Sequence, residues 1–149
     1  MVKIRVSKQF TFEMSHALFN YDGLCRNIHG HSYRLRVTLL GTPINDSTSP
    51  KNGMVIDFSE LKKLINKSII DELDHSLMIN ADAPHEKFSE LGQMYERHHL
   101  VPFQPTTENL IIFLAEKIRR MLPENTELHS LRLYETTNSF AEWFASDNS

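Results

Sequence analysis

The stretch HGHSYRLRVTLL, residues 29–40, sets the pattern on which the fold of this chain depends. Apolar and polar side chains alternate along it, with Leu35, Val37 and Leu39 on one face and charged or polar residues on the other. A period of two residues is typical of a β-strand with one buried face. We therefore predict a half-buried strand over residues 31–40, of the kind found in antiparallel sheets.

Residues 2–14 show the same alternation, and residues 128–136 and 140–145 show it again near the end of the chain. Between these strands, apolar residues recur every three or four positions in residues 58–73 and 107–122, which is the pattern of amphipathic helices. The order β-β-α-α-β-β predicts an α+β fold in which a four-stranded antiparallel sheet carries two helices on one face. Such a sheet leaves two open edges, and open edges are often paired in an oligomer.

The chain has 149 residues, so we expect one domain spanning residues 1–149. Its net charge of −3 argues against a general nucleic-acid binder, which usually presents a basic face. The first residues lack the apolar block of a signal peptide, and the aliphatic run at residues 110–115 is far shorter than the roughly 20 residues of a membrane span. A single cysteine cannot form an intramolecular disulfide, which is typical of proteins in a reducing compartment. Taken together, these features lead us to expect a cytoplasmic protein that binds neither membranes nor nucleic acid.

Three histidines have the spacing of a metal site. His29 and His31 lie two positions apart at the start of a strand, so their imidazoles point to the same face as Leu35. His16 lies just past the end of the preceding strand and reaches the same end of the sheet if the two strands pair as a hairpin. Three imidazoles leave the fourth tetrahedral position of Zn²⁺ open, as in catalytic sites, whereas ordinary core or loop histidines are the alternative.

The single cysteine and an adjacent acid–histidine pair are candidates for proton transfer. Cys25, in CRNIHGH, is open to three interpretations: a zinc ligand, a thiol activated by a nearby imidazole or metal, or an inert buried thiol. Asp74 and His75 are neighbours in DELDHSLMIN, where the carboxylate can orient the imidazole. A polar helix end would give the same local sequence.

Two glutamates have a structural explanation beside a functional one. Glu108 lies in PTTENL at the start of a predicted helix, which Thr106 or Thr107 would cap, and an acid there interacts favourably with the helix dipole. Glu135 lies in LYETTNS, at the end of a strand whose inward residues are apolar, where solvation of the strand end also explains an acid. Local sequence alone does not choose between these interpretations.

Together the segments FTFEMSHAL, CRNIHGHSYRL, GMVIDFSELK, LDHSLMIN, PTTENL and LYET resemble the 6-pyruvoyl-tetrahydropterin synthase family, in which they occur in this order. The resemblance runs from about Phe10 to Glu135, and the set of motifs is specific although no single motif is. The three residues between Cys25 and His29 resemble the bacterial 6-carboxytetrahydropterin synthases of queuosine precursor synthesis. The resemblance implies a tunnelling fold (T-fold) and a homo-oligomer, a trimer or a hexamer of two trimers, with active sites at subunit interfaces.

The resemblance also implies roles for individual residues. They are Zn²⁺ ligands at His16, His29 and His31, a catalytic thiol at Cys25 with the acid–base pair Asp74 and His75, and a pterin pocket at Thr106, Thr107, Glu108 and Glu135. The implied reaction converts 7,8-dihydroneopterin triphosphate to 6-carboxy-5,6,7,8-tetrahydropterin, with release of triphosphate and acetaldehyde. The alternatives are a 6-pyruvoyl-tetrahydropterin synthase or a side-chain-cleaving aldolase acting on this substrate, or a non-catalytic pterin- or purine-binding oligomer with structural zinc.

One segment departs from the family pattern. Residues 81–104 are longer than in compact bacterial members, and we expect a surface excursion with a short helix, with coverage of the pocket as the alternative. This segment contains His85, His98 and His99. No motif assigns the triphosphate contacts, for which the candidates on charge alone are Arg26, Lys51 and Arg97.

Overall fold

A computed structural model describes the backbone of residues 1–149 and every side chain except those of residues 85–88 and 91. His85 lies outside the described side chains, so what was expected of it stays a prediction. Among the helices of the described residues, none has the length and apolar character needed to cross a bilayer.

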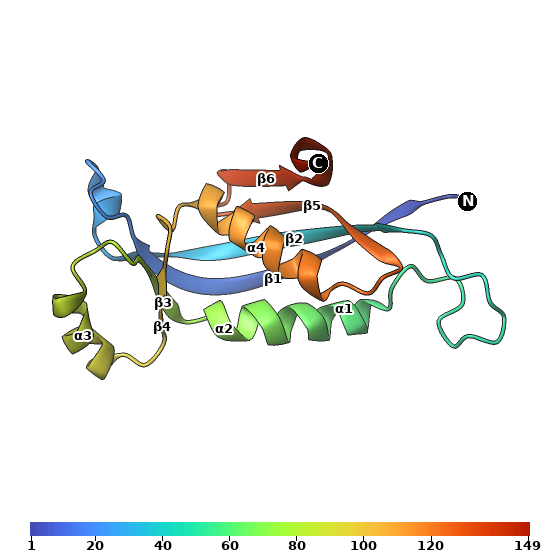
Figure 1. Ribbon diagram of the computed structural model, residues 1–149, viewed down its shortest axis with the longest axis horizontal. Coiled ribbons are helices and arrows are strands. Elements are labelled where there is room, and N and C mark those ends of the chain that lie inside the picture. Colours follow the sequence, from blue (N-terminus) through green and yellow to red (C-terminus); the bar gives the residue numbers. More distant parts are fainter.

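A long hairpin of β1 (Ile4–Ala17) and β2 (His29–Gly41) forms the centre of the molecule (Figure 1). Its antiparallel register pairs Phe12 with Tyr33 and His16 with His29. Because side chains alternate along each strand, these four residues point to one face of the sheet. The rings of Phe12 and Tyr33 stack there with centroids 5.0 Å apart. The hairpin therefore carries the predicted histidines on the face that the core covers.

Among the described residues the sheet has six strands, in the order β4-β3-β1-β2-β5-β6. Two antiparallel strands extend the hairpin on one side, β5 (Thr126–Tyr134) and β6 (Phe140–Phe144). Two parallel strands extend it on the other, β3 (Ser76–Asn80) and β4 (His98–Val101). The predicted α+β class is confirmed, but the four-stranded, wholly antiparallel sheet is wrong. The sequences of β3 and β4, SLMIN and HHLV, do not alternate between apolar and polar residues, so periodicity does not identify these strands.

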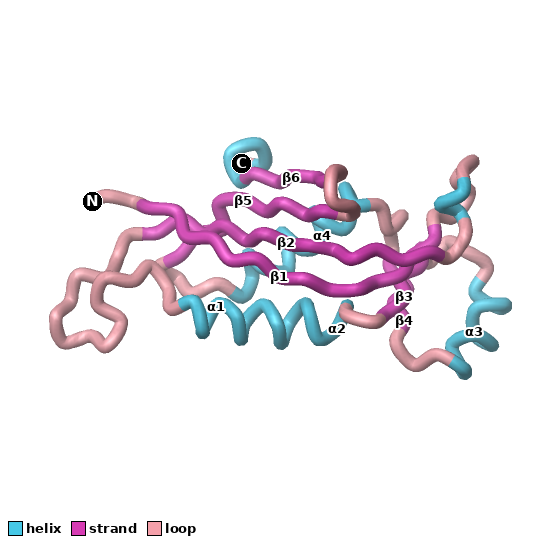
Figure 2. Tube along the Cα trace, turned by 180° about the vertical axis from the view of Figure 1, so that it is seen from behind, coloured by secondary structure: helices cyan, strands magenta, loops and turns pink.

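Helices cover one face of the sheet, and the strands are uncovered when the molecule is seen from behind (Figure 2). α1 (Phe58–Ile65) continues through a π-helical turn (Asn66–Ile70) into α2 (Asp71–Leu73), which together match the predicted helix over residues 58–73. α4 (Thr107–Met121) forms the second helix of this layer. The expected caps are present: Asp57 Oδ1 accepts from the Ser59 amide, and Thr106 Oγ1 accepts from the Asn109 amide.

The hydrophobic core lies between these helices and the sheet. α4 presents Leu110, Leu114 and Ile118 to it at intervals of four residues, and all three are fully buried. Each such side chain contributes about 1.5–3 kcal/mol through burial. The core therefore holds the hairpin rigidly, and with it the residues at the end of the hairpin.

The segment over residues 81–104 contains α3 (His85–Met94) and then β4. The predicted short helix is present, but the segment is more than a surface excursion, because β4 joins the sheet. Leu77 pairs with His98 and Asn80 with Val101 in parallel register. Short 3-10 turns at Leu24–Arg26 and Ala145–Asn148 complete the chain.

Candidate functional site

Three histidines meet at one end of the hairpin. His16 lies opposite His29 in the register, and His31 lies two positions further along the same face of β2. One ring nitrogen from each of the three lies within 4.8 Å of the others. Zn–N bonds of roughly 2.0–2.1 Å place tetrahedral nitrogen ligands about 3.3 Å apart, so small adjustments of these rings suit one ion.

Hydrogen bonds fix which nitrogen of two of these rings faces the others. His16 Nδ1 lies 2.6 Å from the Pro105 carbonyl oxygen, and His29 Nδ1 lies 2.8 Å from that of Asn27. A carbonyl oxygen only accepts, so each Nδ1 carries a proton and each Nε2 keeps a lone pair. The two Nε2 atoms are 2.9 Å apart. Two lone pairs at this distance repel unless a cation lies between them, so this donor set fits a metal ion.

Burial favours the neutral imidazoles that bind metals. Desolvation lowers the pKa of His16 below the ordinary 6.5, and the neighbouring His29 and His31 lower it further, against the Pro105 carbonyl and Glu135. Burial also lowers the pKa of His31, with Glu135 again acting in the opposite direction. These two rings are therefore unprotonated at neutral pH and available as ligands.

Glu135 lies beside the triad, just beyond the end of β5. Its amide donates to the Ser139 carbonyl at 3.0 Å and so begins the turn into β6. Its Oε1 lies 3.4 Å from His31 Nε2 and 3.7 Å from His16 Nε2. The carboxylate would thus lie next to a cation bound by the triad, and its oxygens can accept hydrogen bonds from a ligand.

A hollow of about 340 Å³ adjoins the triad. Its lining includes most of the remaining residues singled out in the sequence, namely Cys25, Thr106, Thr107, Glu108 and Glu135. Thr107 Oγ1 is buried and has no hydrogen-bond partner among the described residues. An unpaired buried hydroxyl costs about 1–3 kcal/mol of stability. Cys25 is exposed on the 3-10 turn that precedes β2.

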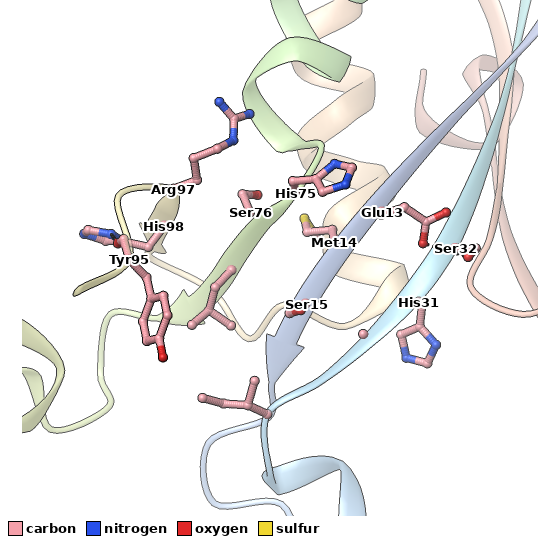
Figure 3. Close-up of a pocket in the computed structure, with 13 residues that line it drawn as sticks. Glu13, Met14, Ser15, His31, Ser32, His75, Ser76, Tyr95, Arg97 and His98 are labelled. Carbon is pink, nitrogen blue, oxygen red and sulfur yellow. Dashed lines mark hydrogen bonds between the residues drawn. The ribbon is translucent and has the colours of Figure 1, made fainter. Parts of the chain in front are cut away.

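His75 lines a different and larger hollow, of about 770 Å³ (Figure 3), and Asp74 precedes it in the chain. Asp74 Oδ2 is 3.0 Å from His75 Nδ1, and Asp74 Oδ1 accepts from the Glu13 amide at 2.7 Å. The Glu13 hydrogen bond is the main reason that the pKa of Asp74 is lowered, so the carboxylate stays ionised. With Nδ1 facing the acid, His75 Nε2 is left to accept a proton, and the side chain is 75% exposed.

Within one chain, therefore, the predicted site residues form two groups. Cys25 borders the small hollow and His75 the large one. The triad residue His31 also lines the large hollow, with β1 between it and His75 (Figure 3). Sequence reasoning missed the groups that hold both sets in place: the carbonyls of Asn27 and Pro105 and the backbone of Glu13. Every residue carries such backbone groups, so no residue type in the sequence could have revealed them.

Two of the three cations considered for a triphosphate are engaged with the protein. Lys51 forms ion pairs with Asp57 and Glu60. Arg97 donates to main-chain carbonyls at the end of α2. Arg26, on the turn beside Cys25, is exposed.

The two histidines of the 81–104 segment that the structure describes bond to main-chain oxygens. His98 Nδ1 donates to the Tyr95 carbonyl at 3.0 Å, and His99 Nε2 donates to the Glu72 carbonyl at 2.8 Å. Neither belongs to the metal-ligand cluster found among the described residues.

Comparison with known proteins decides the family. The family model described as 6-pyruvoyl tetrahydropterin synthase matches residues 5–145. This chain belongs to that family. The family resemblance seen in the sequence is thus confirmed, and the chain is a member of a group of tetrahydropterin synthases with the T-fold.

Individual family members resemble the chain over nearly its whole length. A protein of Haemophilus influenzae named 6-carboxy-5,6,7,8-tetrahydropterin synthase is 35% identical over 143 residues, which cover 93% of this chain and 97% of that protein. A protein of the same name from Rickettsia typhi is 31% identical, with 93% and 99% covered. The structure of Caenorhabditis elegans 6-pyruvoyl tetrahydropterin synthase matches with a TM-score of 0.67 and 25% identity, and 97% of each chain is covered.

Proposed function

We propose that this protein is a zinc-dependent 6-carboxy-5,6,7,8-tetrahydropterin synthase of the queuosine precursor pathway. It would convert 7,8-dihydroneopterin triphosphate and one water molecule to 6-carboxytetrahydropterin, triphosphate and acetaldehyde, with the water supplying the second oxygen of the carboxylate. The observation that carries the proposal is the triad of converging ring nitrogens beside a hollow that also contains a thiol and a carboxylate. The three-residue interval between Cys25 and His29, and relatives bearing this name, support the carboxy branch of the family.

The small hollow is suited to the pterin ring. A carboxylate at Glu135 can accept two hydrogen bonds from adjacent N–H groups, a geometry that selects the amino-pyrimidine edge. Thr106, Thr107 and Glu108, at the start of α4, form a further part of the lining of this hollow. We infer that the ring binds here with its side chain directed toward the histidine triad.

The metal site is suited to activating that side chain. Zn²⁺ held by His16, His29 and His31 would polarise the hydroxyl oxygens of the side chain and acidify the adjoining C–H and O–H groups. Cys25 would then take up a proton as thiolate, and His75, oriented by the ionised Asp74, would exchange a second one. These transfers would isomerise the side chain and reduce the ring with electrons from the substrate itself.

The proton-transfer set would be completed between neighbouring chains. β3 pairs with β1 only from Met14 onward, so in the described chain residues 4–13 of β1 have a strand, β2, on one side only. β6 is the last strand at the opposite edge of the sheet. Pairing β6 of one copy with β1 of the next would satisfy both edges. The small hollow is bordered by Phe140 of β6, and the His75 amide donates to the Glu13 carbonyl of β1. Pairing of these strands between copies would therefore bring the small hollow of one chain close to His75 of the next, in a trimer or a hexamer of two trimers.

A product assay tests the proposal. Zinc-loaded protein is incubated with 7,8-dihydroneopterin triphosphate beside a Cys25→Ala variant, whose zinc content is measured in parallel. We expect 6-carboxytetrahydropterin and acetaldehyde from the first, and retained zinc with little turnover from the variant.

Each other outcome has a definite meaning. A 6-pyruvoyl product would move the protein to the other branch of the family, and a hydroxymethyl pterin would indicate an aldolase. Absence of turnover, with zinc lost from the Cys25→Ala variant, would indicate a binding protein whose zinc is structural.

A further inference from the structure

A single arginine closes the end of the helix that precedes Asp74 and His75. The Arg97 guanidinium donates through Nη2 to the carbonyls of Asp71, at 2.5 Å, and Glu72, at 3.2 Å. Its Nε donates to the Asp74 carbonyl at 3.0 Å. The last carbonyls of a helix have no partner within the helix, so this side chain supplies what the helix end lacks.

The rest of the segment around Arg97 strengthens this attachment. His99 Nε2 donates to the same Glu72 carbonyl at 2.8 Å. The Arg97 carbonyl accepts from the Leu77 amide at 3.0 Å, just after the acid–histidine pair. Figure 3 shows Arg97 extending from its strand segment toward the end of the helix that leads into His75. The segment thus fixes the chain both before and after this pair.

His75 itself has a backbone that depends on its surroundings. Its φ of 58° lies in the left-handed region, which favours glycine and is uncommon for other residues. Such a conformation persists only where neighbouring groups determine it. The His75 amide donates to the Glu13 carbonyl at 2.6 Å, and Asp74 accepts from the Glu13 amide. Glu13 holds one side of the pair, and Arg97 holds the other.

We propose that Arg97 is a positioning residue for His75, and that this is the task of the longer 81–104 segment. By fixing the backbone of Asp74, it keeps the carboxylate against His75 Nδ1 and leaves Nε2 free for proton transfer. A planar guanidinium can reach three carbonyls at once, whereas a lysine offers a single point of donation. The inference rests on the proposed function of the pair in catalysis.

The test compares Arg97→Gln and Arg97→Ala with the matched control Lys117→Gln. Lys117 Nζ reaches the Glu72 carboxylate at 2.5 Å, so the control removes a cation from the same helix end without touching its carbonyls. We expect Arg97→Gln to lower kcat by roughly 100-fold, the effect of displacing a proton-transfer group by about 1 Å, with KM and zinc content unchanged. Millimolar guanidinium should restore part of the kcat of Arg97→Ala, and Lys117→Gln should match the unaltered protein.

A second readout does not require turnover. NMR of ¹⁵N-histidine-labelled protein reports the tautomer of His75, assigned with a His75→Gln variant. We expect the Nδ1–H form in the unaltered protein and in Lys117→Gln, and a mixture of tautomers in Arg97→Gln.

The two readouts separate failure of the inference from failure of the proposed function. If the unaltered protein has no turnover, the proposed function fails and the NMR result alone decides the role of Arg97. An unchanged His75 tautomer in Arg97→Gln overturns the positioning role, whether or not kcat falls. Loss of zinc or of folded structure in Arg97→Gln, without recovery by guanidinium in Arg97→Ala, also overturns it, because the arginine would then support the whole fold.

Discussion

Both ring nitrogens of His16 have close polar neighbours. Its Nδ1 is tied to the Pro105 carbonyl, while its Nε2 faces that of His29 at 2.9 Å. The side chain is 1% exposed, so a proton on it would be poorly solvated. The folded chain therefore prefers this residue neutral, which is also the state that binds a metal ion.

This preference predicts how the stability of the metal-free protein depends on pH. Burial lowers the pKa of His16 in the folded state, so below its ordinary value of 6.5 the unfolded chain binds more protons than the folded one. The free energy of unfolding should therefore decrease as the pH falls through about 6.5, and level off below the folded-state pKa. Urea unfolding of the metal-free protein between about pH 7.5 and 5 measures this dependence, which should be shallower in His16→Gln. A variant with the same pH dependence as the unaltered protein would contradict the assignment to His16.

Glu135 offers a second prediction at the scale of one residue. Its carboxylate lies near the triad but is not one of the three grouped ligands, so we expect Glu135→Ala to weaken pterin binding far more than zinc binding. Charge-assisted hydrogen bonds contribute about 1.5–3 kcal/mol each, so a loss of at least roughly tenfold in pterin affinity is expected. Calorimetric titration with a pterin, beside zinc titration of the metal-free form, measures both. Equal weakening of pterin binding and zinc binding would mean that Glu135 acts at the metal. Glu135→Gln keeps the shape of the side chain and removes its charge, so it serves as the control for side-chain size.

At the scale of elements, α4 connects the core to the site. Thr106 caps it and Thr107 begins it at the small hollow, while Leu110, three residues after Thr107, is fully buried. The position of the pocket-lining residues therefore depends on how the helix packs on the sheet.

Shortening one buried and one exposed side chain of α4 should show how much of the stability of the protein depends on the packing of this helix on the sheet. Leu110→Ala leaves a cavity in the core and should lower the free energy of unfolding by about 2–5 kcal/mol. Ile112, on the same helix, is 49% exposed, and Ile112→Ala should change it by no more than about 1 kcal/mol. Urea unfolding of both variants gives the comparison, and similar losses would show that α4 is packed differently.

For the whole molecule, the proposal that a neighbouring chain completes the site makes a prediction. Cys25→Ala and His75→Ala should each lack turnover, because each removes one half of the proton-transfer set. If the halves come from neighbouring chains, oligomers in which both variants are mixed at random contain about one quarter intact sites. Co-expression with two different tags, purification on both, and the product assay would measure the recovery. No recovery in a mixed oligomer, whose mass is checked by light scattering, would mean that Cys25 and His75 of one chain act together.

Much of the fold follows from local patterns in the sequence. Period-two alternation identifies β1, β2, β5 and β6, and period-3.6 patterns with their caps identify the two long helices. Periodicity does not identify β3 and β4 because SLMIN and HHLV do not alternate between apolar and polar residues, and the parallel pairing of these strands is decided by contacts distant in sequence. The sequence pattern also predicts one continuous helix over residues 58–73, whereas in the structure a π-helical turn separates α1 from α2.

The side chains available for chemistry can be read from the sequence alone. They are three imidazoles at strand positions that share a face, one thiol, an adjacent acid and histidine, and a threonine–glutamate helix start. The physical reason is that strand periodicity fixes the direction of side chains two residues apart. Three relations become visible only in the folded chain: His16 Nε2 faces His29 Nε2, Cys25 and His75 border different hollows, and Arg97 binds the carbonyl of Asp74, 23 residues before it. These relations depend on strand register and on backbone carbonyls, which every residue carries and no sequence motif marks.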